Sequence, residues 1–371
     1  DITIPDFYST EEFENAYTYD GDDLGATWSK ESTTFKVWAP TAAGVKVNLY
    51  KGGEEGKDDL IESHDMESDD KGVWEVKVDG DLNGTYYTYT ADFGDTQNEA
   101  CDPYAKTVGV NGDRAMVIDM DSTNPAGWDN DSNPNKNLKN TDVSIYELHV
   151  RDLSSDASSG IKNTGKYLGL TETGTTNSKG QSTGLDHIKE LGITHIQLNP
   201  VYDYATVDET KLDTNQFNWG YDPKNYNSPE GSYSTDPYNG DVRVKEFKEM
   251  VKTLHDNDIS VVMDVVYNHT YSTDYCYNKL VPDYFYRPGS NGSGCGNDVA
   301  SERAMVRNFI VDSVAYWAKE YHIDGFRFDL VGLIDVQTIK EIRAALDEID
   351  PSIIIYGEGW SMTTTTTKEV T

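Results

Sequence analysis

A short apolar run that ends in charged residues, Ile323-Asp324-Gly325-Phe326-Arg327-Phe328-Asp329, follows directly after a segment with helical periodicity, residues 304–320. The same order of a helical segment followed by an apolar run is found on both sides of this stretch. Apolar residues recur at helical spacing in further segments, and short apolar runs rich in β-branched residues lie between them. The predicted helices are 184–191, 242–257 and 336–349, and the predicted strands are 143–148, 193–198, 259–266 and 352–356. This alternation predicts a parallel sheet with helices outside it.

Long inserts after individual strands favour a (β/α)₈ barrel, in which function resides in the loops that follow the strands. Five barrel strands are predicted, whereas a complete barrel has eight strands in about 250 residues. The chain ends first, in a threonine-rich stretch at 361–367 that is typical of a surface loop. We therefore predict an incomplete barrel over residues 141–371 that is inactive alone. The missing half would come from a continuation of the chain or a second chain.

The N-terminal part has a different pattern. Residues 33–38, 45–50, 73–78 and 86–90 alternate with period two and are separated by turn residues, which predicts a small β-sandwich over residues 24–120. Residues 121–140, rich in Asn, Asp and Pro, are predicted to be a linker, and residues 1–23 an N-terminal extension. The expected fold class is α/β: an N-terminal β-sandwich followed by an incomplete (β/α)₈ barrel.

Composition narrows the range of partners. The 65 acidic and 31 basic residues give a formal net charge of -34, which disfavours nucleic acid. No run approaches the roughly 20 apolar residues of a membrane span, and no signal peptide is recognisable at residue 1. The three cysteines fit neither a disulfide framework nor a zinc motif. Cys276 and Cys295 bracket one loop, and the sequence leaves open whether they pair.

Carboxylates stand at the ends of consecutive predicted strands. Arg327 precedes Asp329 by two residues on the same face, and a nearby cation favours an ionised carboxylate. Glu358 lies in the partly apolar stretch 356–360, which is expected to raise its pKa and make it a proton donor. Taken singly, each acid could merely cap a helix. Together, one ionised and one protonated carboxyl group are what a retaining glycosidase requires.

Four segments carry a resemblance. Residues 264–269 (DVVYNH), 325–329 (GFRFD) and 356–360 (YGEGW) resemble the first three signature regions of the α-amylase family. Residues 217–223 (FNWGYDP) closely resemble the Tyr-Asn-Trp-Gly-Tyr-Asp-Pro heptapeptide of type I pullulanases, with Phe217 in place of the first tyrosine. The predicted sandwich is similar to the starch-related carbohydrate-binding module that precedes the barrel in pullulanases and isoamylases. The chain is thus identified as the N-terminal portion of a type I pullulanase, through the third signature region.

The resemblance implies a role for each catalytic residue. Asp329 is similar to the nucleophile that forms a covalent glycosyl-enzyme, Glu358 to the general acid/base, and Arg327 to the residue that orients the nucleophile. The fourth signature region of the family, a His-Asp pair after strand seven, has no counterpart after Glu358.

The resemblance also implies a substrate-binding set. Tyr221 resembles the aromatic platform under the sugar next to the scissile bond, and His269 a hydrogen-bonding residue at that sugar. Asp264 would organise the site. The remaining predicted substrate-binding residues are Asn268, Asp222 and Trp219, and Trp219 and Asn218 could equally serve to pack the loop.

The implied function is that of a retaining endo-glycosidase, a debranching hydrolase of α-1,6-glucosidic bonds in pullulan, amylopectin and limit dextrins. The alternatives are an α-1,4-acting amylase or branching enzyme of the same family, and a non-catalytic starch-binding component. No cofactor is required, and calcium is an optional addition because Asn268 stands where some relatives bind it. The expected partner is an α-glucan, with no nucleic acid and no membrane insertion. The expected location is extracellular, secreted or at the cell surface, since polymeric glucans are met outside the cell.

Overall fold

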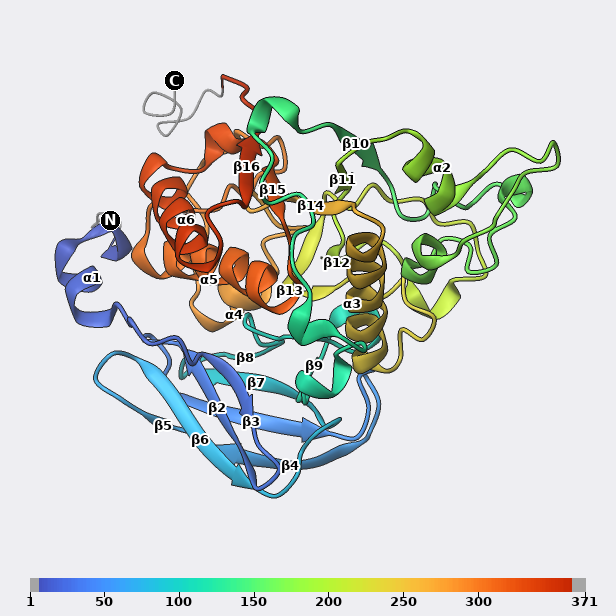
Figure 1. The fold of residues 1–371 in the computed structure, drawn as a ribbon. Coiled ribbons are helices and arrows are strands. Elements are labelled where there is room, and N and C mark those ends of the chain that lie inside the picture. Colours follow the sequence, from blue (N-terminus) through green and yellow to red (C-terminus); the bar gives the residue numbers. More distant parts are fainter. Residues whose placement is uncertain (1–6, 362–371) are drawn as a thin grey trace.

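The computed structural model describes residues 7–361, and the outer residues, including most of the threonine-rich stretch, lie outside that range. Figure 1 shows a β-sandwich below a layered α/β unit. The strands are β1 (Gly25–Trp28), β2 (Ser32–Trp38), β3 (Gly44–Tyr50), β4 (Leu60–Asp65), β5 (Glu67–Ser68), β6 (Val73–Asp79), β7 (Tyr86–Asp92), β8 (Gln97–Ala100), β9 (Ala115–Met116), β10 (Ile145–Leu148), β11 (His195–Leu198), β12 (Tyr202–Tyr204), β13 (Pro223–Pro229), β14 (Ser260–Val265), β15 (Gly325–Phe328) and β16 (Ile354–Gly357). The α-helices are α1 (Glu11–Tyr17), α2 (Gly184–Glu190), α3 (Gly240–Asp256), α4 (Cys276–Leu280), α5 (Ala304–Glu320) and α6 (Val336–Ile349).

The sandwich consists of two antiparallel sheets, ordered β1-β2-β6-β5 and β4-β3-β7-β8, with β9 paired to β7. Alternate residues of each sheet point into a shared core, as the period-two pattern predicts. Phe35 of β2 meets Tyr87 of β7 edge-on, with ring centroids 4.9 Å apart. The four predicted runs are the central strands β2, β3, β6 and β7, so the predicted sandwich is confirmed.

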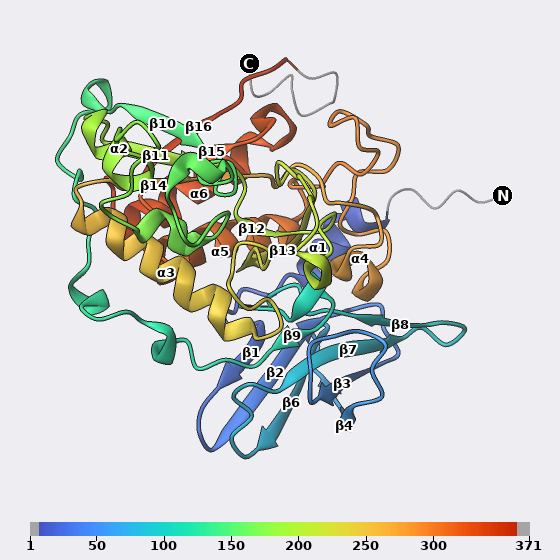
Figure 2. The same ribbon diagram turned by 90° about the vertical axis from the view of Figure 1, so that its right-hand side faces the viewer.

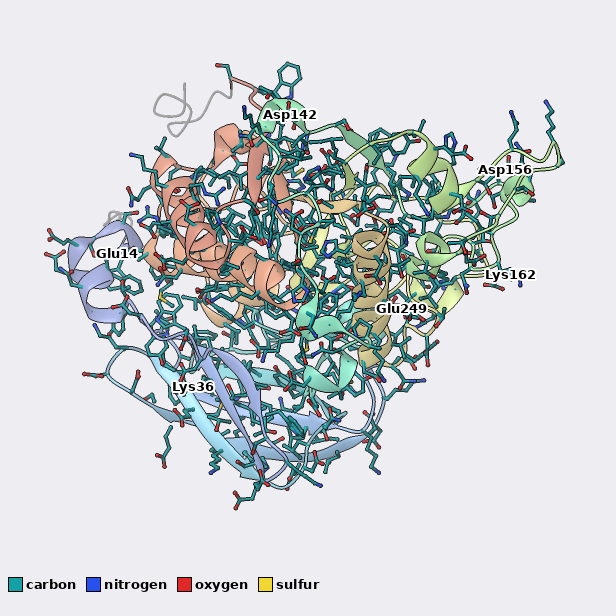
Figure 3. All side chains as sticks on the ribbon, viewed as in Figure 1. Glu14, Lys36, Asp142, Asp156, Lys162 and Glu249 are labelled. Carbon is teal, nitrogen blue, oxygen red and sulfur yellow. The ribbon has the colours of Figure 1, made fainter. Side chains whose placement is uncertain are left out.

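The segment preceding the sandwich contains a helix that the sequence analysis did not identify. Thr10 caps α1, accepting a hydrogen bond from the Phe13 backbone. Glu14 accepts hydrogen bonds from the Ala304 backbone at 3.1 and 3.2 Å, and thereby caps α5 as well. Figure 3 labels Glu14 on this outlying helix, and it also shows Asp156 and Lys162 on a protruding loop between β10 and α2. Among the described helices, none has the length and apolar character required to span a bilayer.

Residues 121–140 are packed along the barrel rather than extended as a free connection. Trp128 is 5% exposed, and its ring stacks on that of His322 at 4.0 Å and 9°. The side-chain amide of Asn135 donates to the Thr194 carbonyl at 2.9 Å and to Ser260 Oγ at 3.0 Å. The polar composition of this segment therefore provides contacts to the barrel.

The barrel sheet has the order β10-β11-β14-β15-β16 and all its pairs are parallel. These are the five predicted strands. The predicted helices 304–320 and 336–349 agree with α5 and α6 at both ends, and α5 packs against α6 (Figures 1 and 2). Register places Asp264 opposite Arg327 and Arg327 opposite Tyr356. Because parallel strands end at one edge of the sheet, the residues after β14, β15 and β16 converge there.

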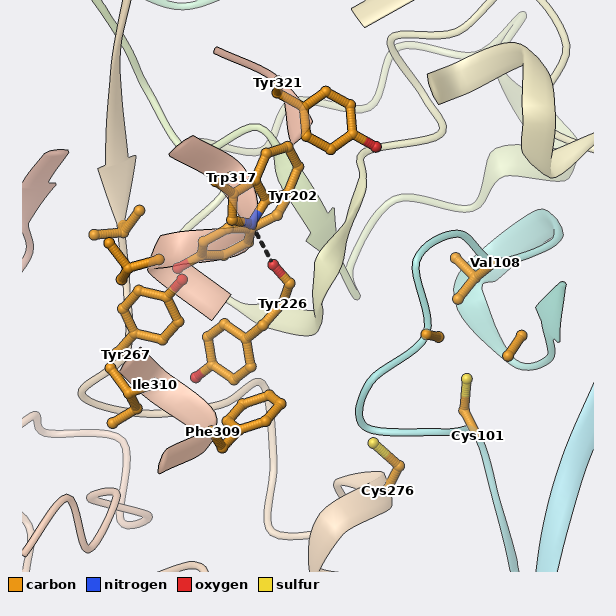
Figure 4. Close-up of a cluster of buried hydrophobic side chains, with 14 of the residues drawn as sticks. Cys101, Val108, Tyr202, Tyr226, Tyr267, Cys276, Phe309, Ile310, Trp317 and Tyr321 are labelled. Carbon is orange, nitrogen blue, oxygen red and sulfur yellow. Dashed lines mark hydrogen bonds between the residues drawn. The ribbon is translucent and has the colours of Figure 1, made fainter. Parts of the chain in front are cut away.

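A cluster of buried aromatic side chains joins α5, β13 and the segment after β14 (Figure 4). Trp317 of α5 donates its indole hydrogen to the Tyr226 carbonyl at 2.8 Å. Tyr226 in turn stacks on Tyr267, with ring centroids 5.0 Å apart. These large buried side chains, together with Tyr202, fix the position of β13 and of the segment that follows β14.

All three cysteines are free. Cys276 is buried and Cys295 is exposed, so the pairing that the sequence left open is not formed. Figure 4 instead shows Cys276 facing Cys101, and both line a cavity of about 560 Å³ between the sandwich and the barrel loops.

Candidate active site

Arg327 is the centre of a charged cluster at the carboxyl edge of the barrel sheet. Its Nη1 atom lies 2.9 Å from Asp264 Oδ1 and 3.0 Å from Asp329 Oδ1. Its Nη2 atom lies 3.3 Å from Glu358 Oε2. One guanidinium thus contacts the three acids that the sequence predicted at consecutive strand ends, and it fixes the orientation of their carboxylates.

Asn268 is hydrogen-bonded to both the backbone and the side chain of Asp329. Its amide nitrogen donates to the Asp329 carbonyl at 2.9 Å and to Asp329 Oδ2 at 3.0 Å. The side chain is fully buried, and its oxygen faces His269 Nδ1 at 2.6 Å. Asn268 was predicted to bind substrate, but the structure places it where it orients the predicted nucleophile.

His269 and Tyr221 link this cluster to the heptapeptide loop. His269 Nε2 lies 2.8 Å from the Tyr221 carbonyl oxygen, so both ring nitrogens already have protein partners. The Tyr221 hydroxyl donates to Asp264 Oδ2 at 2.8 Å. Asp264 is completely buried, so its part in the site is to hold Arg327 and Tyr221.

The loop 217–222 is braced by its own side chains. The Asn218 amide nitrogen donates to Asp222 Oδ1 at 2.8 Å, and its oxygen accepts from the Gly220 backbone at 2.8 Å. Gly220 has φ +94°, and a Cβ atom there would lie 2.8 Å from the Pro200 carbonyl oxygen. Asn218 and Asp222 therefore stabilise the loop, and glycine is required at 220.

Two aromatic side chains of this loop remain open to solvent. Trp219 is 61% exposed and Phe217 is 52% exposed, and their rings meet edge-on at 6.3 Å. Trp219 was predicted either to bind substrate or to pack the loop. Its exposure leaves the side chain available to a ligand.

His149 and Tyr233 were not identified from the sequence. His149 directly follows β10, and its Nε2 atom lies 2.8 Å from the Asn218 carbonyl oxygen and 3.1 Å from the Tyr233 hydroxyl. The available signal was positional, because His149 stands immediately after a predicted strand, as Asp329 does.

The directions of the two catalytic pKa shifts differ from the prediction. Burial raises the pKa of Asp329, and this effect outweighs the hydrogen bonds from Asn268 and the charge of Arg327. Burial also acts to raise the pKa of Glu358, but hydrogen bonds from Trp360 and Leu330 and the charge of Arg327 bring the net pKa below its ordinary value. The predicted apolar pocket around Glu358 was wrong: Trp360 is 63% exposed, and its indole donates to Glu358 Oε1 at 2.7 Å.

Leu330, next to the predicted nucleophile, has a left-handed backbone conformation with φ 40° and ψ 51°. This conformation is rare for a leucine and is often found at functional sites. It aims the Leu330 backbone N–H at Glu358 Oε2, at 3.2 Å. The two strand ends are therefore connected by backbone as well as by Arg327.

A second acidic group lies apart from the Arg327 cluster. Asp203, Glu209 and Glu230 are buried and close enough to hold a metal ion, as judged within the described residues. Arg243 already occupies this group, with Nη1 3.2 Å from Asp203 Oδ1 and Nη2 3.1 Å from Glu209 Oε2. A guanidinium in this position leaves no suitable place for a cation, so the group does not fit a calcium site.

Comparison with known proteins places both parts of the chain. Residues 23–105 match the family model of carbohydrate-binding module 48, the isoamylase N-terminal domain. Residues 87–284, more than half of the chain, match the α-amylase catalytic domain.

Several relatives match nearly the entire chain. The pullulanase of Bacillus subtilis (strain 168) is 42% identical over 98% of this chain and 50% of its own length. Pullulanase 1, chloroplastic, of Arabidopsis thaliana is 34% identical over 93% of this chain and 40% of its own length. The crystal structure of the Paenibacillus barengoltzii pullulanase in complex with maltohexaose and α-cyclodextrin has a TM-score of 0.94 at 50% identity, and covers 98% of this chain and 57% of that chain. The chain thus spans about half the length of the curated relatives it matches first. With its signature residues gathered around Arg327 and its sequence and structural similarity to pullulanases, the chain belongs to the α-amylase family of glycoside hydrolases.

Proposed function

We propose that the protein to which this chain belongs is a retaining endo-glycosidase that hydrolyses α-1,6-glucosidic bonds in pullulan, amylopectin and related α-glucans. The observation that carries the proposal is the contact of one guanidinium, Arg327, with both Asp329 and Glu358 at neighbouring strand ends. Two carboxyl groups held together in this way are the requirement for double displacement with retention.

The proposed reaction has two steps. Asp329 attacks the anomeric carbon while Glu358 gives its proton to the departing glycosidic oxygen, and the sugar is left bonded to Asp329. Glu358, now ionised, then takes a proton from water as the water oxygen attacks the same carbon and releases Asp329. The protein returns to its starting state, and the anomeric configuration is retained.

The pKa values of the free site change when a glucan binds. A glucan chain bound at the Arg327 cluster would displace water from Glu358 and compete with the exposed Trp360 indole, which donates to Glu358 in the free protein. Both changes raise the pKa of Glu358, because they remove stabilisation from its ionised form. Asp329 keeps its hydrogen bonds from Asn268 and Arg327, which favour its ionised form during attack.

The α-1,6 linkage is favoured over the α-1,4 alternative by two observations. The relatives compared above are pullulanases, and residues 217–223 resemble the pullulanase heptapeptide, with Tyr221 bonded to Asp264 of the catalytic cluster. A non-catalytic starch-binding role is disfavoured because the Asp329, Glu358 and Arg327 side chains are held in contact.

The proposed chemistry relies on carboxyl groups and requires no metal. Calcium remains an optional addition in the proposal, although the Asn268 side-chain oxygen faces His269 and not an open site. The proposed partner is an α-glucan, and the rest of the barrel is expected as a continuation or a second chain. The proposed location is extracellular, where polymeric glucans such as pullulan are met.

The test uses the full-length protein and its Asp329→Asn variant. Wild type is expected to release maltotriose from pullulan with retention and to leave linear amylose largely intact. The variant is expected to lose at least about 10³-fold in kcat, while its Kd for maltotriose stays within a few-fold of wild type. Cleavage of amylose but not pullulan would favour the α-1,4 alternative, and an active variant would exclude Asp329 as nucleophile.

A further inference from the structure

The heptapeptide loop is attached to the barrel at two backbone carbonyls, each by a histidine. His269, after β14, contacts the Tyr221 carbonyl oxygen through Nε2 at 2.8 Å. His149, after β10, contacts the Asn218 carbonyl oxygen through Nε2 at 2.8 Å. The strands β10 and β14 lie on either side of β11, so the loop is fastened across the edge of the sheet.

We propose that His149 is a positioning residue for glucan binding. It holds the Asn218 carbonyl and thereby sets where Trp219 and Tyr221 lie. This inference rests on the proposed glycosidase function. His149 acts through the loop and not on the reacting atoms.

The surroundings of His149 define its tautomer. The Asp152 backbone N–H donates to His149 Nδ1 at 3.3 Å, so Nδ1 is an acceptor. The ring hydrogen therefore lies on Nε2, where it is donated to the Asn218 carbonyl. The ring is held on two sides, by Phe217 at 5.5 Å and by Tyr233 edge-on at 5.9 Å. A histidine fixed on this many sides is a rigid support for the loop.

The loop transmits this support because its interior is rigid. The Asn218 side chain bonds to Gly220 and Asp222, so a shift of residue 218 is passed to both. Asp222 is in turn held by the Ala205 backbone and by Thr206. Tyr221 lies at the end of this turn, and its hydroxyl donates to Asp264. Trp219, between Asn218 and Gly220 in the turn, is exposed. Loss of the His149 contact would leave the internal bonds intact but release the turn from β10. Small displacements of binding groups have large effects on the population of reactive geometries.

The experiment compares His149→Ala and His149→Gln with a control, His187→Ala, in the full-length protein. His187 is an exposed residue on α2. The glutamine side chain can still donate an N–H from the position of Nε2, whereas alanine cannot. Pullulan kinetics are measured for each variant, and the Kd of maltotriose is measured in an Asp329→Asn background where no turnover occurs. Thermal unfolding reports the stability of each protein.

We expect His149→Ala to raise both KM and the maltotriose Kd by about tenfold, because the variant loses a hydrogen bond and a ring contact. His149→Gln should recover to within about threefold, and His187→Ala should equal wild type. In the Asp329→Asn background, equal Kd values with and without His149→Ala would overturn the inference, as would a glutamine variant no better than alanine. If wild type binds maltotriose but does not cleave pullulan, the proposed hydrolysis fails while the Kd series still decides the role of His149. A wild type that binds no maltotriose would overturn both.

Discussion

Glu358 shares the guanidinium of Arg327 with Asp329: Nη1 lies 3.0 Å from Asp329 Oδ1, and Nη2 lies 3.3 Å from Glu358 Oε2. The same Nη1 atom also contacts the buried Asp264. The planar guanidinium of Arg327 therefore links the two catalytic carboxylates, in addition to the bonds from Asn268 and from the Leu330 backbone. Lysine carries the same charge but lacks that planar fork.

Arg327→Lys is expected to lower kcat on pullulan by about 10²- to 10³-fold, because a single ammonium cannot hold three carboxylates in one arrangement. Steady-state kinetics and thermal unfolding are the measurements. Arg343→Lys on α6, where the arginine pairs with Asp347, should leave kcat unchanged. A kcat within threefold of wild type would show that charge alone is sufficient at position 327.

Asp264 makes stability depend on pH. Burial, above all, raises the pKa of Asp264 to about 7, from an ordinary value of 3.8. Its contribution to stability is therefore complete below pH 3.8 and is lost as pH rises through 7. Asp264→Asn cannot ionise, so it should gain stability relative to wild type between pH 4 and pH 8. Urea unfolding at several pH values measures the gap, and a gap that is constant with pH would contradict the prediction.

Arg243 is the counter-ion of a buried acidic group, and its guanidinium is fully buried. Arg243→Met should reduce the free energy of unfolding by about 3–5 kcal/mol or prevent folding, since it leaves buried carboxylates unpaired. Lys245→Met on the same helix removes only an exposed pair with Asp241, and should change stability by less than about 0.5 kcal/mol. Urea unfolding of the two variants provides the comparison, and equal effects would refute the assigned role of Arg243.

His255 supports the far end of the barrel between two acids. Its Nδ1 atom lies 2.7 Å from Asp131 and its Nε2 atom 2.7 Å from Asp324, and His322 also contacts Asp131. Burial opposes the charged form, but the two carboxylates prevail and raise the pKa of His255 to about 9. The stability it provides is complete below pH 6.5 and is lost as pH rises through 9. His255→Gln should therefore be destabilised strongly at pH 6 and only weakly at pH 10, as measured by thermal unfolding across this range.

The fold was predictable where the signal is local. The apolar runs of β14 and β15 and the helical spacing of α5 and α6 are properties of short segments, and they gave the strands and helices correctly. The short α1 and the pair β12 and β13 were missed because their stability depends on contacts with distant parts of the chain, such as Glu14 with Ala304. Thr10 followed by acidic residues was a usable capping signal for α1.

The site was predictable in composition but not in electrostatics. Motif positions identified Asp329, Glu358 and Arg327, and the structure brings them into contact. The directions of the two pKa shifts could not be inferred, because they depend on how deeply Asp329 is buried and on the direction of the Trp360 indole. His149 and Asn218 are 69 positions apart in the sequence, so no local sequence pattern could predict their contact.

The buried Arg243 has a consequence for how the two parts of the chain are inherited. Its Nη2 atom donates to the Gly109 carbonyl at 3.2 Å, and Asn111 donates its backbone N–H to Glu209 at 2.8 Å. Both residues lie in the sandwich, between β8 and β9. The Tyr86 hydroxyl, within the sandwich, donates to the Tyr238 carbonyl beside α3. The barrel thus uses backbone and side chains of the N-terminal module to complete its own interior. A module exchanged from another enzyme would have to reproduce these contacts, so the two parts are constrained to evolve as one unit.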